Sequence, residues 1–239
     1  MKLAIMQPYF SPYIGYFQLI NAVDKWIVFD IVQYKRHHWI NRNRVLHPNS
    51  GWQYIIVPLK KHPRDISIKD ILVDNGIDWK NKIIRQLQHY SKKAPFYTET
   101  INFLKECLFA EYYNGSSLLK LNTYILKKIC EKMNIRFDYA ICSEMDLQFE
   151  EIKQPGEWAL TISEQLGAEE YINPYGGKNI FNPAKFKEKN IKLKFLKCNS
   201  IEYEQKGYKF VSDLSIIDVM MWNSEYEVSS MLNRYELIT

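Results

Sequence analysis

The sequence predicts an α/β protein with a Rossmann-like parallel or mixed sheet, flanked by helices and carrying a helical insertion or lid. Short apolar runs that suit strands alternate with helical patterns along the chain, and such alternation is typical of a parallel sheet. No low-complexity linker or internal repeat interrupts the 239 residues. We therefore expect one α/β domain over 1–239, with a helical subdomain at about 78–133.

The first unit of this sheet lies at the start of the chain. An apolar run over 3–6 predicts a strand, which breaks at Pro8, and a second breaker follows at Pro12. Gly15 and the apolar pattern behind it then open a helix, and a second strand is expected over 26–29. Strand, breaker-rich turn, helix and strand together make the first unit of an α/β sheet.

A hairpin and three helices are expected in the middle of the chain. The HPNSG turn at 47–51 joins two strands into the hairpin. Pro95 stops the first helix, and Gly115–Ser116 supplies a boundary and a cap between the other two. The elements are strands over 45–46 and 53–59, an amphipathic helix over about 78–91, and helices near 96–111 and 116–133.

Strands and helices alternate again towards the end of the chain. Gly167 is the glycine signal that ends the first helix of this part. The elements expected here are a short strand over 136–142, a helix over 156–166, strands over 170–173 and 191–197, and helices near 213–222 and 225–234.

Polar and aromatic side chains gather directly behind the first two predicted strands. Open α/β sheets bind ligands beyond the carboxyl ends of their strands. Tyrosine joins a flat apolar face to a hydroxyl, which suits pockets for sugars and other partly polar ligands. The residues expected in this site are Gln7, Tyr9, Tyr13, Gly15, Asp30 and Gln33, with Asn41, Arg42 and Arg44 just downstream.

Arginine and asparagine alternate in the segment WINRNR, residues 39–44. On an extended segment Asn41 and Asn43 would point one way, and Arg42 and Arg44 the other. Paired guanidinium groups suit a pyrophosphate or a carboxylate, and Lys60 could add to them. The alternative is an edge strand with solvent-facing arginines.

A second candidate segment follows the strand over 170–173. Gly176 and Gly177 leave backbone N–H groups unobstructed and allow positive φ, so an anion-binding nest is expected there, with Asn173 beside it. The alternative is an ordinary turn. Further on, Asp218 lies at a predicted helix start, where it either assists the helix dipole or reaches the pocket.

The net charge of +5 is mild, and its positive residues cluster at 35–44, 60–64 and 178–197. Such clusters could hold phosphates. No zinc-finger, RNP or helix-turn-helix signature accompanies them, so we expect a small polyphosphate-bearing ligand and no nucleic acid. For the cluster at 178–197 a solvated helix face is the preferred interpretation.

Apolar stretches are too short for a membrane span, and the N-terminus does not resemble a signal peptide. The four cysteines are widely spaced without a CxxC pair, which indicates reduced thiols and neither a zinc site nor a disulfide framework. We therefore expect a cytoplasmic protein that needs no metal or other cofactor. Its oligomeric state does not follow from the sequence.

Six segments of the chain carry a family resemblance. They are MQPYFSPYIGYFQLINAVDKWI (6–27), WINRNR (39–44), VPLKK (57–61), KKAPFY (92–97), YINPYGG (171–177) and LSIIDVMMWN (214–223). Together they resemble the WbqC-like proteins of bacteria, in the right order over almost the whole chain. The resemblance implies a role in surface polysaccharide (O-antigen) biosynthesis, as a transferase that acylates an amino sugar with a group such as glycine. The partners implied are a nucleotide sugar and an activated acyl or aminoacyl donor.

Residues 10–20 also resemble the nucleotidylyltransferase pattern F-x-P-x-H-x-G-H-x-x-L-I, and residues 30–34 a strand-end segment of pantothenate synthetases. This resemblance implies a HUP-type fold, in which the glycine lets adenine approach the helix. Tyr13 and Tyr16 replace the phosphate-binding histidines and carry no charge near neutral pH. The spacing also slips by one residue.

The predicted chemistry is amide formation on an amino sugar. Asp30 is the expected general base for the sugar amine, and Gln7 or the amides of Gly176 and Gly177 would hold the developing oxyanion. Two alternatives stay open: a nucleotidyl-transferring or adenylate-forming enzyme, and a non-catalytic module that binds a sugar nucleotide. Cys198 lacks a histidine partner and is not expected to act as a nucleophile.

Overall fold

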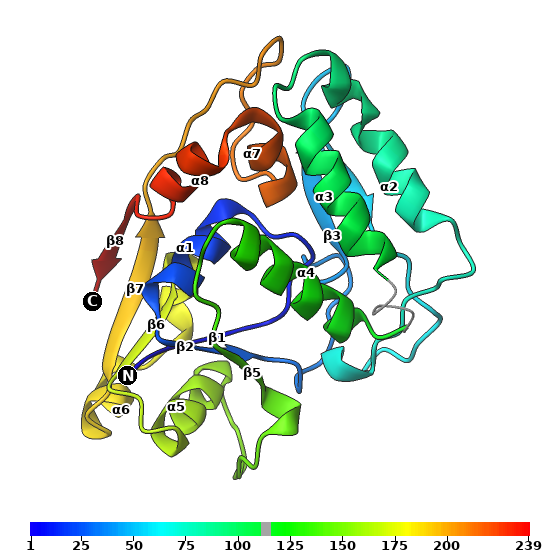
Figure 1. The fold of residues 1–239 in the computed structure, drawn as a ribbon. Helices are drawn as coiled ribbons and strands as arrows, with labels where there is room; N and C mark the ends of the chain where they lie inside the picture. Colours follow the sequence, from blue (N-terminus) through cyan, green and yellow to red (C-terminus); the bar gives the residue numbers. More distant parts are fainter. Residues whose placement is uncertain (111–115) are drawn as a thin grey trace.

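A six-stranded sheet forms the centre of the structure, a computed structural model that describes residues 1–110 and 116–239 (Figure 1). The strand order is β5-β2-β1-β6-β7-β8, and only β8 runs antiparallel to its neighbour. The mostly parallel sheet between helices confirms the predicted α/β class. Its strands are β1 (Lys2–Met6), β2 (Lys25–Val28), β5 (Tyr139–Ile141), β6 (Glu170–Pro174), β7 (Lys192–Cys198) and β8 (Tyr235–Ile238).

The chain reverses its direction across the sheet at β1. Strand β2 lies on one side of β1 and β6 on the other. The pairing of β1 with β6 ends at Leu3 and Tyr171, although β1 continues to Met6 and β6 to Pro174. The two strands therefore do not pair with each other towards their carboxyl ends, although each stays paired with its other neighbour. A switch point of this kind is where open α/β sheets bind ligands.

Helices cover both faces of the sheet. One face packs against Ile162 of α5 and Phe186 of α6, and the opposite face belongs to a larger buried cluster with α1, α4 and α7. The helices are α1 (Ile14–Ala22), α2 (Trp79–Leu87), α3 (Tyr97–Phe109), α4 (Leu118–Lys132), α5 (Pro155–Gln165), α6 (Pro183–Glu188), α7 (Ile216–Trp222) and α8 (Glu225–Met231). No helix in the described ranges is long and apolar enough to cross a membrane.

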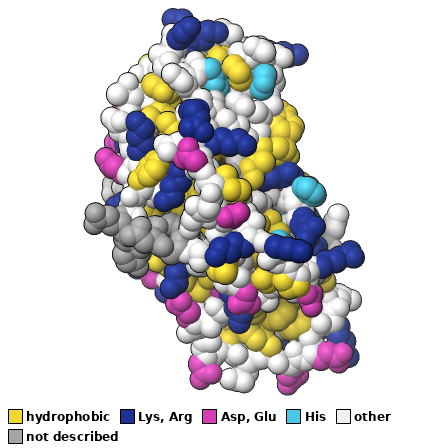
Figure 2. Space-filling model, turned by 90° about the vertical axis from the view of Figure 1, so that its right-hand side faces the viewer, with side chains coloured by type: hydrophobic (Ala, Val, Ile, Leu, Met, Phe, Trp, Pro, Cys, Tyr) yellow, Lys and Arg dark blue, Asp and Glu magenta, His cyan; other side chains and the backbone are white. Residues whose placement is uncertain are grey.

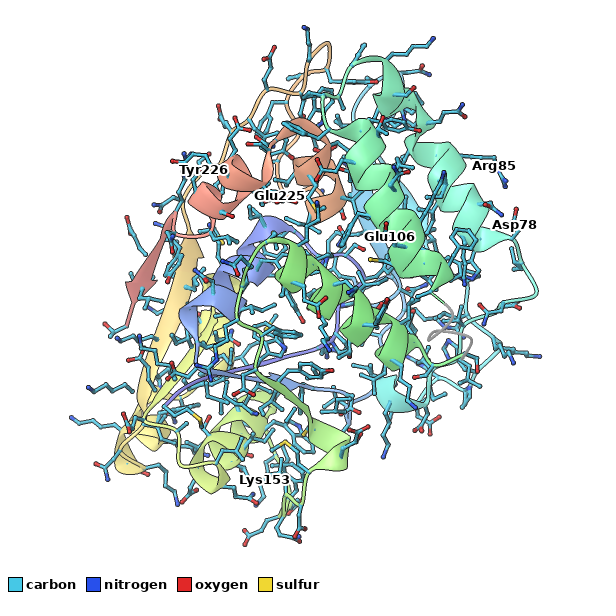
Figure 3. The ribbon with its side chains drawn as sticks, viewed as in Figure 1. Asp78, Arg85, Glu106, Lys153, Glu225 and Tyr226 are labelled. Atoms are coloured by element: carbon cyan, nitrogen blue, oxygen red, sulfur yellow. The ribbon has the colours of Figure 1, made fainter. Side chains whose placement is uncertain are left out.

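The predicted hairpin is present as β3 (Arg42–Leu46) and β4 (Trp52–Ile56), paired antiparallel outside the central sheet. Its buried residues share the larger core cluster with the helices α2, α3 and α4. The amphipathic helix is also confirmed as α2. Its Trp79 and Ile83 are buried, while Asp78 and Arg85 form an ion pair of 3.3 Å on its outer side (Figure 3).

Three details differ from the expectations. Ser117 caps α4 by accepting a hydrogen bond from the backbone of Lys120, a role expected for the Gly115–Ser116 pair; Gly115 itself lies outside the described residues. The strand β8 was not expected, because four residues carry too little pattern to distinguish them from a chain end. The short helix α6 falls within the basic cluster at 178–197 and buries Phe186.

The breaker-rich loop over 7–13 is held by buried polar side chains from three distant elements. Asn43 of β3 donates to the carbonyls of Phe10 and Ser11, each at 3.0 Å. Asn122 of α4 donates to the carbonyls of Pro8 and Ile40 at 2.8 and 2.7 Å. Because buried carbonyls need partners, these amides fix the path of a loop that has no regular secondary structure.

Ser215 completes this attachment from the start of α7. Its hydroxyl donates to the carbonyl of Ser11 at 2.7 Å, and the next backbone N–H, that of Ile216, donates to the carbonyl of Pro12 at 2.8 Å. Ser11 itself has φ of 42° in the left-handed region. The loop is therefore rigidly placed between β3, α4 and α7.

We expect Asn122→Ala to lower the free energy of unfolding by about 1–3 kcal/mol, because it leaves two buried carbonyls without their donor. Urea unfolding followed by circular dichroism measures the change. Asn21→Ala is the matched control: Asn21 is exposed and bonds only the exposed side chain of Asn233, so its loss should cost less than about 0.5 kcal/mol. Equal costs for the two variants would contradict the attachment.

Candidate functional site

Two cavities open beyond the carboxyl ends of β1 and β7, and they share Tyr13 and Asp213 in their walls. The first, here called the Arg44 cavity, has a volume of about 270 Å³ and is lined by Tyr9, Pro12, Tyr13, Trp39, Asn43, Arg44 and Asp213. The second, the Cys198 cavity, has a volume of about 350 Å³ and is lined by Tyr13, Ile14, Gly15, Cys198, Asn199, Ser200, Ile201, Tyr203, Ser212, Asp213, Leu214 and Val219.

Tyr9 and Tyr13 come from the rigid loop behind β1, as the sequence predicts. Burial raises the pKa of both hydroxyls, so both stay protonated at neutral pH. Tyr13 is also the residue before α1, and its side chain does not cap that helix. Its hydroxyl is therefore available as a neutral donor or acceptor in the wall between the cavities.

Gly15 lies where a larger residue would force its neighbours to move. A Cβ built on it would come within 2.4 Å of a ring carbon of Tyr13 and 2.5 Å of the sulfur of Cys198. The predicted close approach to this glycine is therefore real, but the approaching groups are the protein's own side chains. An adenine that approached this glycine, as the resemblance to the nucleotidylyltransferase pattern implies, would meet Tyr13 and Cys198.

Arg44 links β3 to the segment before α7. Its guanidinium donates to the carbonyl of Asp213 at 3.1 Å, and its own carbonyl accepts a hydrogen bond from the backbone of Ser215 at 2.8 Å. The guanidinium also lies 5.4 Å from the ring centre of Trp39, in the range of a cation–π contact. Arg44 thus supplies a positive charge and holds Asp213 in the shared wall.

Asp213 is the functional candidate that the sequence analysis missed. Its side chain is exposed, accepts a hydrogen bond from the Ser212 hydroxyl at 3.0 Å, and makes no ion pair with the described cationic side chains. Its backbone φ of 54° is left-handed, a conformation that Asp tolerates better than most residues. The only local signal is a polar Ser-Asp pair before a helix, so nothing in the sequence connects it with residues 9–15.

The Cys198 thiol is not prepared for nucleophilic attack. Burial, and then the negative charge of Asp213, raise its pKa, so the thiolate is scarce at neutral pH. No histidine lines the cavity that contains it. Among the described residues, no group of three His, Cys, Asp or Glu side chains could hold a metal ion.

Asp30 follows β2 as predicted, but its side chain is fully buried. Its two carboxylate oxygens accept hydrogen bonds from the backbone N–H and the hydroxyl of Ser143, which is exposed and follows β5. Gln7 is half-buried behind β1, and its carbonyl accepts from the Tyr16 hydroxyl at 2.8 Å. Neither Asp30 nor Gln7 lines the two cavities.

Asn41 and Gln33 hold neighbouring loops. Asn41 accepts a hydrogen bond from the Tyr34 hydroxyl at 2.9 Å and donates to the carbonyl of Val57 at 2.9 Å. Gln33 donates to the carbonyl of Arg64 at 2.8 Å. Both side chains are therefore occupied by the protein in this structure.

Arg42 and Lys60 lie outside the cavities. The Arg42 guanidinium donates to the carbonyl of His37 and stacks 4.1 Å above the ring centre of Tyr54. Lys60 is exposed. The predicted alternation of the WINRNR segment is confirmed by burial, since Asn43 is buried while both arginines are partly exposed.

The expected nest at Gly176 and Gly177 is wrong in its geometry. Both glycines lie in a 3-10 helix, η5 (Tyr175–Ile180), and neither has positive φ. A Cβ on Gly177 would come within 2.3 Å of the side-chain amide of Asn173. Gly177 therefore makes room for Asn173, which accepts a hydrogen bond from the Tyr171 hydroxyl.

Asp218 is a buried acid beneath the Cys198 cavity. It accepts hydrogen bonds from the hydroxyls of Tyr90 and Tyr203 and from the amide of Gln205, with 2.7 Å to Tyr203 and 3.1 Å to Gln205. Burial raises the pKa of Asp218 to about 6, although these hydrogen bonds act in the opposite direction and lower it. Tyr203 lines the cavity, so Asp218 reaches the site through Tyr203 and does not line it.

These features define an α/β protein whose candidate ligand site lies at the carboxyl ends of the strands, beside the switch point of the sheet. The chain belongs to the WbqC-like protein family, whose model matches residues 7–230. It is 28% identical to "Uncharacterized protein Rv1507c" of Mycobacterium tuberculosis over 221 residues, and this matched stretch covers 92% of each chain. No solved structure matches this chain.

We expect Gly15→Ala to distort the site, because its methyl group would displace the Tyr13 ring or the Cys198 sulfur. Overpacking of this kind costs about 1–3 kcal/mol of stability, which thermal unfolding would detect. Alkylation of Cys198 by a maleimide should also change in rate. Gly176→Ala is the control, since a Cβ there meets nothing within 4 Å; a similar loss in both variants would contradict the close contact at Gly15.

Asp218 should make the protein less stable as the pH rises from about 4 to about 6. An unfolded Asp titrates near pH 4, so between these values the folded state binds more protons than the unfolded state. The free energy of unfolding therefore falls by up to about 3 kcal/mol as the pH rises. Urea unfolding at pH 4, 5, 6 and 7 measures the slope. Asp218→Asn should remove this part of the slope; parallel curves for the two proteins would contradict it.

Proposed function

We propose that this protein is a transferase of surface polysaccharide biosynthesis. It joins an activated acyl or aminoacyl group, such as glycine, to the amine of an amino sugar that is carried on a nucleotide. Membership of the WbqC-like family supports the pathway. The proposal places the reaction in the cytoplasm, which agrees with the wide spacing of the cysteines. It also includes no cofactor.

The observation that carries the proposal is the pair of cavities with a shared wall. A transferase must bring two substrates to one point, and two adjoining cavities can hold them side by side. The Arg44 cavity offers a cation and aromatic rings, which suit the phosphate end of the nucleotide sugar. The Cys198 cavity offers hydroxyl and amide groups from Ser200, Ser212 and Asn199, which suit a sugar ring.

The reaction requires that the sugar amine lose a proton as it attacks. The amine nitrogen forms a bond to the acyl carbonyl carbon, and the bond from that carbon to the donor's leaving group breaks. The leaving group takes the bonding electron pair, and the proton moves from nitrogen to a carboxylate. Asp213 is the carboxylate in the shared wall, so it can reach a group in either cavity.

Asp30 remains a second candidate for the base, acting through Ser143. Its carboxylate is enclosed, while Ser143, whose hydroxyl donates to it, is an exposed residue, so a proton would have to pass through that hydroxyl. The side-chain amide of Gln7 bonds to none of the described residues and is the proposed donor to the oxyanion. Asn173, Gly176 and Gly177, behind β6, are proposed to contact the substrate from the other side of the switch point.

Turnover of a nucleotide-linked amino sugar with an activated glycine, followed by mass spectrometry, tests the proposal. Asp213→Asn should lower kcat at least 100-fold, as loss of a general base does, and leave substrate binding in calorimetry intact. Asp30→Asn and Ser143→Ala should reduce turnover together if the base is Asp30. Unchanged rates in all three variants would reject a carboxylate base, and no amide product with any acyl donor would reject the transferase.

A further inference from the structure

Five side chains form a continuous surface on the outer face of the β3–β4 hairpin. We call it the arginine–aromatic platform, and its members are Trp39, Arg42, Arg44, Trp52 and Tyr54. Arg44 and Tyr54 are paired across the two strands. Because side chains alternate along a strand, Arg42 and Arg44 share one face with Trp52 and Tyr54, while Asn43 and Ile55 on the other face are buried.

Arginines and rings contact one another throughout the platform. Arg42 lies 4.1 Å from the ring centre of Tyr54, and Arg44 lies 5.3 Å from that of Trp52 and 5.4 Å from that of Trp39. The rings of Trp52 and Tyr54 meet edge to face, with 4.8 Å between centres. Each ring is therefore held in a fixed orientation, and Trp52 still exposes 42% of its surface.

The charge of the platform is not neutralised by ion pairs among the described residues. Neither Arg42 nor Arg44 makes an ion pair with a carboxylate of the described residues, and the Nε of each is buried without a hydrogen-bond partner. Arg36, His37 and His38 just before the platform are exposed and add further basic groups. Figure 2, which shows one face of the molecule, likewise has Lys and Arg side chains gathered in its middle and upper parts, beside hydrophobic patches.

The platform continues directly into the Arg44 cavity, because Trp39 and Arg44 belong to both. Resting on the nucleotide-linked substrate of the proposed function, we propose that the nucleoside base stacks on the exposed ring of Trp52 while the diphosphate lies against Arg42 and Arg44. The sugar then enters the cavity past Trp39. The arrangement matches both halves of the ligand, since aromatic faces suit a base and unpaired guanidinium groups suit a diphosphate.

Stacking makes the recognition tolerant of the base, because every base has an aromatic face. Calorimetry with UDP, ADP and inorganic pyrophosphate tests this. UDP and ADP should bind with affinities within about tenfold of each other. Trp52→Ala should weaken the binding of both UDP and ADP by about 5- to 100-fold, the effect of losing one stacked base. The same change should leave the affinity for pyrophosphate unaltered. Arg42→Ala should weaken all three ligands.

Two controls separate binding from folding. Trp52→Phe retains an aromatic face and should recover most of the affinity. Tyr226→Ala, on the outside of α8 (Figure 3), removes a ring that is 84% exposed and should change nothing. Equal UDP affinity in Trp52→Ala and the unchanged protein would overturn the platform, as would the absence of any UDP or ADP binding.

The transfer assay distinguishes a failure of the platform proposal from a failure of the proposed transferase function. If the unchanged protein makes the amide product and Trp52→Ala leaves the KM for the nucleotide-linked sugar unaltered, the transferase stands and the platform is wrong. If the KM rises with kcat preserved, the platform is supported. If the unchanged protein makes no product but binds UDP through Trp52, the transferase is wrong and the platform stands as a nucleotide site.

Discussion

The candidate site depends on the attachment of the loop over 7–13 by three buried polar side chains. Asn43, Asn122 and Ser215 come from β3, α4 and α7, yet all donate to carbonyls of this one loop. Two prolines deprive the loop of backbone donors and prevent it from joining a strand or helix. Its carbonyls must therefore find partners elsewhere, and those partners draw the hairpin and two helices around the end of β1.

The same attachment places the charged groups of the site. Asn43 and Arg44 are neighbours on β3, so the amide that holds the loop and the guanidinium that enters the cavity point to opposite faces of one strand. Arg44 in turn binds the carbonyl of Asp213, and Ser215 binds both the loop and β3. A cation and a carboxylate are thus fixed near each other without pairing side chain to side chain, which leaves both available to a ligand.

Local pattern was sufficient for five of the six strands of the sheet, all but β8, and for the first half of the site. Tyr9, Tyr13 and Gly15 follow a strand through proline breakers, and strand ends in α/β sheets predict binding sites. Asp213 carries no such signal, because its role arises only when Arg44 and Ser215 connect β3 to the start of α7. Asp30 shows the opposite case: its position after β2 was predicted, but the partner that encloses it, Ser143, follows β5, over a hundred residues later.

The tyrosines in place of histidines change what the end of β1 can do. A histidine pair could carry positive charge to a phosphate, whereas Tyr13 and Tyr16 remain neutral because burial raises the pKa of each. The positive charge comes instead from Arg44 on the hairpin, on the far side of the loop from α1. A phosphate would therefore sit towards β3 and not at the helix, where Gly15 is covered by Tyr13 and Cys198. A phosphate position away from the helix favours a site in which the phosphates anchor the sugar that the nucleotide carries and do not themselves react.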